Sequence, residues 1–574
     1  MPSNFILANR RNHLTEGFWS LLKRTANIPA LLSVLILFSF LTLKPLWEAP
    51  GWPQNHEYDS FAKRTIIYAQ HFSFNDFVPI WSSLDNNGFG SPMPLYYHKL
   101  YYFLSGLILL TTGDVKLSLI LAILLFSVFG AAGVYGVGRE LISSRFLASV
   151  GSLMFLSANY TVTNWLIRGA LAEFSAAMLI PWALMYFIKS LKLARIQTGL
   201  AVSLGLIFLG HSVICYFLIL LFGLVLMIMI FSKTTSKGIL SIRTLFVPAL
   251  VFTAITSPYL VVMWAFSSDY DMQRIVPPFY HPMNQFRPMW RYFWNDWIWG
   301  QTWEHLTVQL DLPVLFMIGV GVLGLIFSLS KKSVGQHDPR LPKLVPILPF
   351  IMIFTIVLML QDSFSAFFYE YFPGAQFLQF PWRLLGVLTP VMIVMALYLL
   401  EKAFPPVLSK SISCICLMWM VVGCGAFAPI HYGRLTSLGN SLKDINFSAY
   451  GEYVPRIVST SVPPHLDQVF SSFKGVGCLC QYVKQNSEVR RVVFHFVCER
   501  SANVPIPLFT SPYHKVTALS EKGSPINVSL QKSPSFPGFC CIDLPEGISE
   551  VQVEMPTFCT VFNAISIKLM SWSN

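Results

Sequence analysis

Charged side chains are scarce in this sequence. Asp, Glu, Lys and Arg make up 12% of the 574 residues, whereas apolar residues make up 54% and the mean hydropathy is +0.56. An average soluble chain carries about 25% charged residues. The shortage of charge excludes an ordinary soluble enzyme, a disordered chain and a coiled coil, and it predicts a protein that crosses a membrane several times.

Nucleotide and metal motifs are also missing. The expected internal loops are short and basic and contain no phosphate-binding loop, so we do not expect chemistry driven by cytosolic ATP. No compact group of His, Cys, Asp or Glu with metal-ligand spacing is visible. The sequence therefore assigns no cofactor and no metal.

Twelve apolar runs approach the length needed to cross a bilayer, which is about 20 residues. The first follows a basic segment and lacks the cleavage site of a signal peptide, so we interpret it as a retained span. The run from Ile196 to Phe231 is long enough for two spans, with Gly210-His211-Ser212 as the break. Beyond residue 430 nothing is apolar enough to span. The runs lie at 28–46, 94–112, 116–138, 146–166, 173–188, 196–212, 213–231, 244–265, 312–329, 344–360, 383–400 and 411–428.

Lys and Arg decide the orientation of these runs, because cytoplasmic loops collect them. If the run at 94–112 crosses fully, the basic loops after it fall outside; if it stays on the outer side, they all fall inside. This run is rich in Tyr and contains His98 and Lys99, which is typical of an interfacial helix. We therefore predict eleven spans, with the N-terminus inside and the C-terminus outside.

This topology accounts for the excess of basic over acidic residues in the chain. The internal segments hold 18 basic and four acidic residues, so the net charge of +12 is an orientation signal and nucleic acid is not needed as a partner. We expect a multi-pass protein of the cell inner membrane. It has a cytoplasmic segment over 1–27, a transmembrane domain over 28–429 with a first external loop over 47–115, and a periplasmic or external domain over 430–574.

The first external loop opens with the sequence EYDSFAKR, which begins at Glu57 and ends at Arg64. Apolar residues follow at near-helical spacing, which predicts a short helix on the membrane with Glu57 or Asp59 near its start. Asp59 and Lys63 are four residues apart, so the alternative is a surface ion pair with no chemical role.

Three other outer segments carry charge at the membrane boundary. The third span ends with Arg168 and Glu173, which form either a structural pair or a functional site, because an unpaired charge is costly there. His211 lies at the outer turn between two spans and could be purely structural. Arg383 lies at the outer edge of the tenth span, where it can snorkel or hold a phosphate.

The third external loop is rich in tryptophan. An aromatic belt at the interface explains this without any activity. The alternative is a lid over a lipid-linked substrate, with Arg287 or Arg291 near a phosphate. The tryptophans are Trp290, Trp294, Trp297, Trp299 and Trp303.

Together these groups suit a reaction whose donor is a membrane-bound phosphate ester. A loop carboxylate would deprotonate an acceptor hydroxyl or nitrogen, and Arg and His groups would hold the departing phosphate.

Several segments resemble one bacterial membrane family. They are EYDSFAKR, NNGFGSPMPLYY, NWLIRGALAEF, FLGHS, FLQFPWR and GEYVP, and RGALAEF and QFPWR are the most specific. The resemblance covers most of the chain. The family is often labelled 6-pyruvoyl-tetrahydropterin synthase-related, although nothing here resembles the soluble pterin enzyme, and it belongs with the GT-C type glycosyltransferases.

The resemblance implies an enzyme that uses a polyprenyl-phosphate-linked sugar donor on the external face. It implies interfacial helices in the first loop and a catalytic acidic residue at Asp59, with Glu57 as the alternative. Candidate contacts to phosphate or sugar are Arg64, Arg168, Glu173, His211 and Arg383. In the family pattern a His follows the first-loop Asp by three residues, whereas here that position is Ala62.

The region from about residue 450 onward predicts an antiparallel β-sandwich, because short alternating runs are separated by turns. Such a domain would bind the acceptor or brace the loops. Six of the ten cysteines lie in it, which suggests disulfides with fifteen possible connectivities; zinc is the alternative, but the CxC and CC spacings do not match common zinc sites. The six are Cys478, Cys480, Cys498, Cys540, Cys541 and Cys559. The other four, Cys215, Cys414, Cys416 and Cys424, fall in spans, where we expect packing roles.

Three functions are therefore open. The first is transfer of a sugar from the lipid-linked donor to an envelope glycan, lipid or protein. The second is a lipid or glycan transporter or flippase, which would need polar residues along the spans, and these are scarce. The third is a catalytically degenerate structural partner in envelope assembly, which the departure at Ala62 allows.

Overall fold

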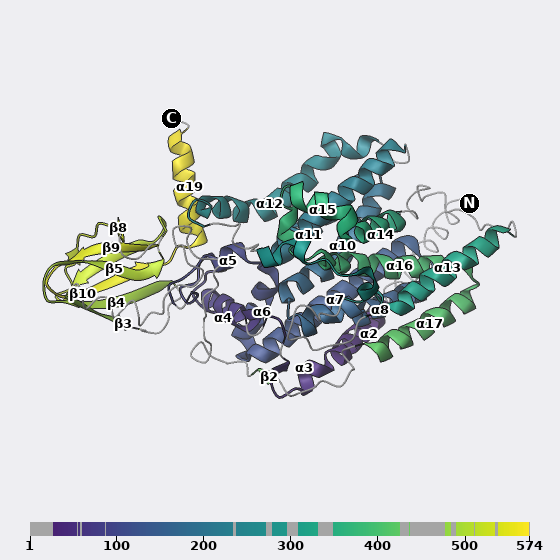
Figure 1. Cartoon of the computed structure of the whole chain (residues 1–574), viewed down its shortest axis with the longest axis horizontal. Helices are drawn as coiled ribbons and strands as arrows, with labels where there is room; N and C mark the ends of the chain where they lie inside the picture. Colours follow the sequence, from purple (N-terminus) through teal and green to yellow (C-terminus); the bar gives the residue numbers. More distant parts are fainter. Residues whose placement is uncertain are drawn as a thin grey trace, which may run out of the picture.

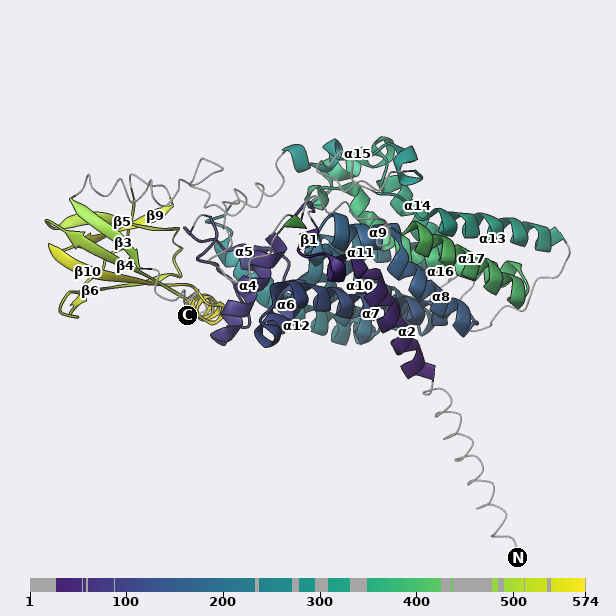
Figure 2. The same cartoon turned by 90° about the horizontal axis from the view of Figure 1, so that it is seen from below.

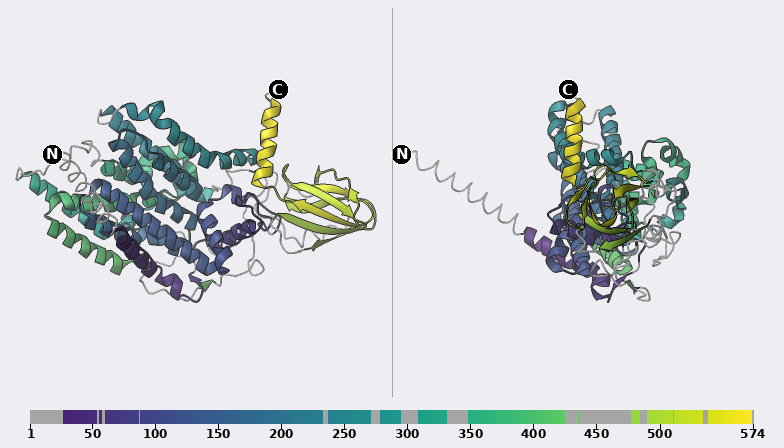
Figure 3. Two further views of the ribbon diagram at one scale, coloured as in Figure 1. Left: turned by 180° about the vertical axis from the view of Figure 1, so that it is seen from behind. Right: turned by 90° about the vertical axis from the view of Figure 1, so that its left-hand side faces the viewer.

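The computed structural model describes residues 27–53, 55–57, 60–86, 88–232, 237–270, 278–294, 308–330, 348–424, 435–436, 477–483, 490–509, 511–533 and 538–572. The molecule is elongated, with helices over most of its length and β-strands at one end (Figures 1 and 3). We refer to the end of the helical bundle that adjoins these strands as the strand end.

Most of the chain forms apolar helices, as the composition predicts. Six helices in the described residues are long and apolar enough to cross a membrane, or eight if each of two bent pairs is one span, so this is a helical membrane protein. These helices do not decide the number of spans, so the eleven spans stay a prediction. The helices are α2 (Asn27–Thr42), α3 (Lys44–Glu48), α4 (Ser60–Ser73), α5 (Met93–Tyr96), α6 (Leu100–Thr112), α7 (Val115–Leu141), α8 (Arg145–Ser157), α9 (Asn159–Val162), α10 (Leu171–Lys192), α11 (Thr198–Phe231), α12 (Ile242–Phe266), α13 (Leu312–Ser330), α14 (Leu348–Met359), α15 (Asp362–Tyr371), α16 (Leu385–Ala403) and α17 (Pro406–Gly423).

Helix α11 breaks where the sequence predicts. His211 has a non-helical backbone inside it, with φ −163° and ψ 96°. Cys215 Sγ lies 3.2 Å from the carbonyl oxygen of Leu204, although eleven residues of straight helix would separate them by about 16 Å. The two arms therefore fold back on each other at His211.

The loop after the first apolar run contains the expected helices, and one of them, α4, is covered. Helix α6 has 13 residues and is about 20 Å long, which is shorter than the hydrocarbon core and consistent with an interfacial position. Helix α4 packs on α6, and both lie between the bundle and the strands (Figures 1 and 2). Nearly all of its side chains are buried, including Lys63 and Arg64, so other parts of the chain cover this helix. Its position on the membrane stays a prediction.

The C-terminal strands form two antiparallel sheets, in the orders β3-β4-β10-β6-β7 and β5-β9-β8. Alternate residues of β4 are buried, as a half-buried strand requires. A short separate pair joins β1 (Trp52–Pro53) to β2 (Leu435–Thr436). The strands of the two sheets are β3 (Cys478–Val483), β4 (Arg491–Cys498), β5 (Ala502–Phe509), β6 (Lys515–Ser520), β7 (Pro525–Ile526), β8 (Gln531–Lys532), β9 (Phe539–Leu544) and β10 (Gly547–Glu554).

The prediction of an all-β C-terminal domain is wrong for residues 558–572, because they form a helix. This is α19 (Phe558–Trp572), which stands at the junction of strands and bundle (Figures 1 and 3). Phe558 faces Tyr259 of α12, with ring centroids 6.3 Å apart. Phe558, Val561, Phe562 and Ile565 have the helical spacing that could have revealed it.

Cysteine usage follows the predictions in part. Cys478 and Cys498 form a disulfide between directly opposed positions of β3 and β4. Cys480, Cys541 and Cys559 are not in a disulfide. In the helices Cys215 and Cys416 are buried, but Cys414 is exposed, so the expected packing role is wrong for Cys414.

Candidate functional site

The centre of the site is a buried ion pair at the beginning of α10. Arg168 donates two parallel hydrogen bonds to Glu173, at 2.6 and 2.8 Å, and the side chains of both residues are 2% exposed. The Tyr160 hydroxyl donates to the same carboxylate at 2.8 Å, and Arg168 also donates to Asn164. The Arg168 guanidinium lies over the Trp382 ring, 4.6 Å from its centroid. Both charges are therefore fixed in position and compensated.

The backbone before α10 sets up this geometry. Residues Thr163–Ile167 form a π-helical turn, a feature that is frequent at functional sites. Gly169 follows with φ +68°, and a Cβ there would lie 2.5 Å from the Asn55 side chain. Glycine is thus required both by conformation and by the close approach of the first loop.

Arg383 joins the pair from a distant part of the chain. Its Nε lies 3.1 Å from a Glu173 oxygen, and its Nη1 donates to the Leu378 carbonyl and to Gln379 Oε1 at 3.0 and 2.9 Å. Gln379 has φ 62° and ψ −49°, and the Phe380 amide donates across it to the Leu378 carbonyl at 2.6 Å. This γ-turn with positive φ is a strained conformation for a residue with a side chain, and it presents two acceptors to Arg383.

The loop between α3 and α4 closes one side of this cluster. The amides of His56 and Glu57 donate to the carbonyls of Ile167 and Arg168, at 3.3 and 3.1 Å. The Glu57 carboxylate accepts a 3.2 Å hydrogen bond from Arg64 and is 29% exposed. Arg64 in turn lies over the Tyr97 ring, 3.6 Å from its centroid. Glu57 is thus the accessible carboxylate of the described cluster.

A stacked pair of imidazoles extends the cluster. The rings of His98 and His211 are 4.0 Å apart and nearly parallel. Each Nδ1 accepts from a backbone amide at 3.4 Å, from Ser212 and Ile214 respectively, so a neutral ring carries its proton on Nε2. Lys99 follows His98, and its Nζ donates to the carbonyls of Leu95 and Tyr97 at 2.6 and 3.1 Å.

Electrostatics favour an anion at this site. Burial, His211 and the cations Lys99, Arg383 and Arg64 hold the pKa of His98 well below its ordinary value. Burial also lowers the pKa of the Lys99 amine to about 7. Even with Lys99 neutral, three arginines face two glutamates among the described residues.

The structure brings together six of the seven site residues that the sequence predicts. They are Glu57, Arg64, Arg168, Glu173, His211 and Arg383. Asp59, the first choice for the catalytic carboxylate, lies outside the described residues. So do Trp297, Trp299 and Trp303, whereas Trp290 and Trp294 are exposed, as an aromatic belt or a lid requires.

Sequence reasoning missed Tyr97, His98, Lys99 and Tyr160 as members of the site. His98 and Lys99 were visible as polar interruptions of an apolar run, but they were assigned only to its interfacial position. Nothing local marks Tyr160, which lies eight residues, or about two turns, before Arg168 in a broken helix. The described residues contain no group of three His, Cys, Asp or Glu that could hold a metal.

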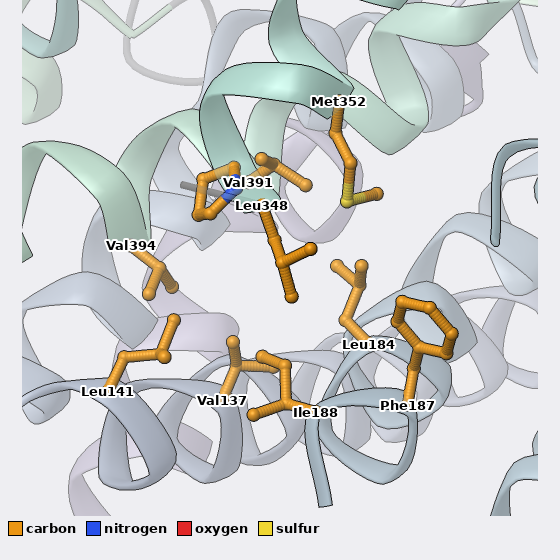
Figure 4. Close-up of a pocket in the computed structure, with 10 residues that line it drawn as sticks. Val137, Leu141, Leu184, Phe187, Ile188, Leu348, Met352, Val391 and Val394 are labelled. Atoms are coloured by element: carbon orange, nitrogen blue, oxygen red, sulfur yellow. The ribbon is translucent and has the colours of Figure 1, made fainter. Parts of the chain in front are cut away.

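A cavity in the bundle lies away from this cluster. It has an empty volume of about 410 Å³, including its open mouth. Leu184 and Leu348 point into it (Figure 4). Leu184 is eleven residues beyond Glu173, which is about 16 Å along α10. The cavity therefore does not belong to the polar site. Its lining is Val137, Leu141, Leu184, Phe187, Ile188, Leu348, Pro349, Met352, Val391 and Val394.

No protein-family model matches the chain, and no curated protein matches it in sequence. Among solved structures it is similar to the arabinofuranosyltransferase AftD from Mycobacteria, with 14% identity and a TM-score of 0.43 over 70% of this chain and 27% of that one. A mutant of the same enzyme gives 14% identity and a TM-score of 0.41 over 69% and 27%.

The chain thus spans about a quarter of the length of AftD. A likeness this weak says nothing about activity. The resemblance to the pterin-labelled GT-C family, which was drawn from the sequence, stays a prediction.

Proposed function

We propose that this protein is a membrane glycosyltransferase. It moves a sugar from a polyprenyl-phosphate-linked donor to a glycan, lipid or protein acceptor of the cell envelope, on the external face of the membrane. The proposal is carried by one observation: among the described residues, three arginines and two glutamates form a cluster in the strand end of an apolar helical bundle, and the carboxylate at its edge is accessible. A lipid-linked phosphate ester fits this arrangement, because its phosphate is an anion that arginines can bind and its lipid tail is apolar like the surrounding bundle.

Arg383 is the strongest candidate for the donor phosphate. It is 13% exposed, whereas Arg168 is 2% exposed and already holds Glu173 with both of its Nη groups. Arg168 and Glu173 therefore fix the position of Arg383, and Arg64, Lys99 and the Nε2 groups of His98 and His211 supply further donors. An arginine fork suits phosphate better than a lysine does.

The proposed reaction forms one bond and breaks one. The acceptor oxygen or nitrogen attacks C1 of the sugar, the bond from C1 to the phosphate oxygen breaks, and polyprenyl phosphate leaves. The acceptor proton passes to Asp59 or to Glu57 two residues earlier. The arginines stabilise the negative charge that grows on the departing phosphate.

The binding half of the proposal is tested without knowing the sugar. We expect the purified full chain in detergent to bind farnesyl phosphate at least ten times more tightly than farnesol, as measured by equilibrium dialysis. Arg383→Met should reduce this preference about tenfold. Arg139→Met, at the far end of α7, is the matched control and should change nothing. Equal affinity for the phosphate and the alcohol would refute a phosphate site.

The catalytic half is tested in proteoliposomes with a panel of polyprenyl-phosphate-linked sugars, with release of polyprenyl phosphate as the readout. Asp59→Asn should abolish release and keep farnesyl phosphate binding. Loss only in Glu57→Gln would assign the base to Glu57. Full activity in both variants would contradict a base in the first loop.

A further inference from the structure

One end of residues 88–99 is embedded in the β-strand region. Phe89 is fully buried, and its ring centroid lies 5.1 Å from that of Phe539 on β9 and 5.6 Å from that of Phe509 on β5. The Phe509 amide donates to the Phe89 carbonyl at 2.7 Å. A residue of the first external loop thus completes the core of the C-terminal sheets.

The turn that presents Phe89 has little freedom. Gly90 has φ +85°, its amide donates to the Asp85 carbonyl at 2.9 Å, and a Cβ there would lie 2.9 Å from Trp81 Nε1. Ser82 and Ser91 exchange two backbone hydrogen bonds of 2.8 Å. The turn therefore transmits a displacement of Phe89 instead of absorbing it.

The middle of the segment is held by the end of α12. The Tyr96 hydroxyl donates to the Met263 carbonyl at 3.1 Å. Leu95 is fully buried in one hydrophobic cluster with Val262, Phe266 and the inner residues of the sheets. The strands, this segment and the end of α12 share a single core.

The other end of the segment forms one wall of the site. Tyr97 lies under Arg64, His98 stacks on His211, and the Lys99 amide donates to the Leu209 carbonyl at 2.8 Å. Eight residues separate Phe89 from Tyr97, which is at most about 29 Å of extended chain. Every turn of that path is packed or hydrogen-bonded.

We propose that the C-terminal β-region positions the donor site through residues 88–99, with Phe89 as a positioning residue that acts through Tyr97, His98 and Lys99. Of the two roles expected for this region, acceptor binding and loop bracing, these contacts support bracing. The inference rests on the proposed function only for its kinetic test. Its structural test stands alone.

The structural test is hydrogen exchange of the full chain in detergent, comparing Phe89→Ala with wild type. We expect the amides of Tyr97 and Lys99 to exchange at least tenfold faster in the variant. Phe77→Ala is the matched control, because Phe77 is in the same loop but is 50% exposed and stacks only on Phe72 among the described aromatic contacts. Unchanged exchange at Tyr97 and Lys99 in Phe89→Ala would overturn the proposal, whether or not the sheets stay protected.

A milder variant distinguishes a displaced segment from unfolded sheets. Tyr96→Phe removes only the hydrogen bond to Met263, and we expect a smaller increase, about threefold, at the same two amides. Protection of Phe494 and Phe496 on β4 should remain at the wild-type level. Wild-type exchange at Tyr97 and Lys99 in this variant would count against the proposed path.

The kinetic test separates positioning from loss of folded protein. A smaller folded fraction lowers kcat and leaves KM unchanged, whereas a displaced site raises KM for the donor. We expect at least a fivefold higher donor KM in Phe89→Ala and substantial recovery in Phe89→Leu. A change in kcat alone would overturn the positioning role. If the wild type transfers no sugar, the proposed function fails and the exchange experiment still decides the structural claim.

Discussion

The Arg168–Glu173 pair makes the sharpest energetic prediction. Glu173→Gln keeps the size of the side chain but removes its charge, so Arg168, which is 2% exposed, loses its counter-ion. The amide also brings two donors toward groups that are themselves donors, the Arg168 guanidinium and the Tyr160 hydroxyl. Breaking a buried pair from one side costs about 3–5 kcal/mol. We expect that loss in the free energy of unfolding.

A double-mutant cycle isolates the pair. Arg168→Met alone should cost a similar 3–5 kcal/mol, because it leaves Glu173 buried with less compensation. The double variant removes both charges, so its cost should fall short of the sum by at least about 2 kcal/mol. Glu140 and Lys192 at the other end of the bundle are the control pair: their side chains are 20% and 22% exposed, and their coupling should stay below about 1 kcal/mol.

The assay is denaturant unfolding of the full chain in mixed micelles, followed by the helical circular dichroism signal. Each variant is compared with wild type at one detergent concentration, so that differences in free energy and not absolute values are used. If the cost of the double variant equals the sum of the two single costs within about 0.5 kcal/mol, the two charges are not coupled, and the reasoning from geometry is refuted.

Three further predictions concern Arg383, Asp85 and the disulfide. Arg383→Lys should weaken farnesyl phosphate binding about tenfold, because an ammonium cannot reproduce the fork that meets Glu173, Leu378 and Gln379; unchanged binding would contradict this. Burial raises the pKa of Asp85 to about 6, so its protonated form stabilises the fold below pH about 4, and that contribution, up to about 3 kcal/mol, is lost as the pH rises through about 6. In Asp85→Asn the melting temperature should depend less on pH between about 4 and 6 than it does in wild type. The same pH dependence in both proteins would argue against the raised pKa of Asp85. Cys498→Ser opens a crosslink between residues 20 apart and should cost roughly 3 kcal/mol in thermal unfolding of the sheets, with reductant abolishing the difference from wild type.

Local patterns in the sequence were enough for several parts of the fold. The apolar runs predicted the helices, and Gly210-His211-Ser212 marked the break in α11 because a hairpin of helices needs a polar turn. The alternation around β4 predicted the sheets. These signals depend only on neighbouring residues, so one chain is enough to recognise them.

The site was predictable only as a collection of residues. Charges near a membrane boundary are costly, and this cost singles out Arg168 and Glu173 in the sequence. Arg383 stands out because an arginine at the outer edge of a span can snorkel or hold a phosphate. That Arg168 holds Glu173 while Arg383 keeps a more accessible guanidinium follows from the three-dimensional arrangement alone. The strained turn at Gln379 also has no signature in the sequence.

The sequence by itself determined that this is a helical membrane protein with a β-rich C-terminal region, because scarce charge and long apolar runs leave no other way to satisfy the backbone. Only the tertiary structure decided that Phe89 enters the core of the sheets and that residues 88–99 continue from there into the site. Such contacts join elements far apart in the chain. They depend on how surfaces pack, which no local periodicity or charge count records.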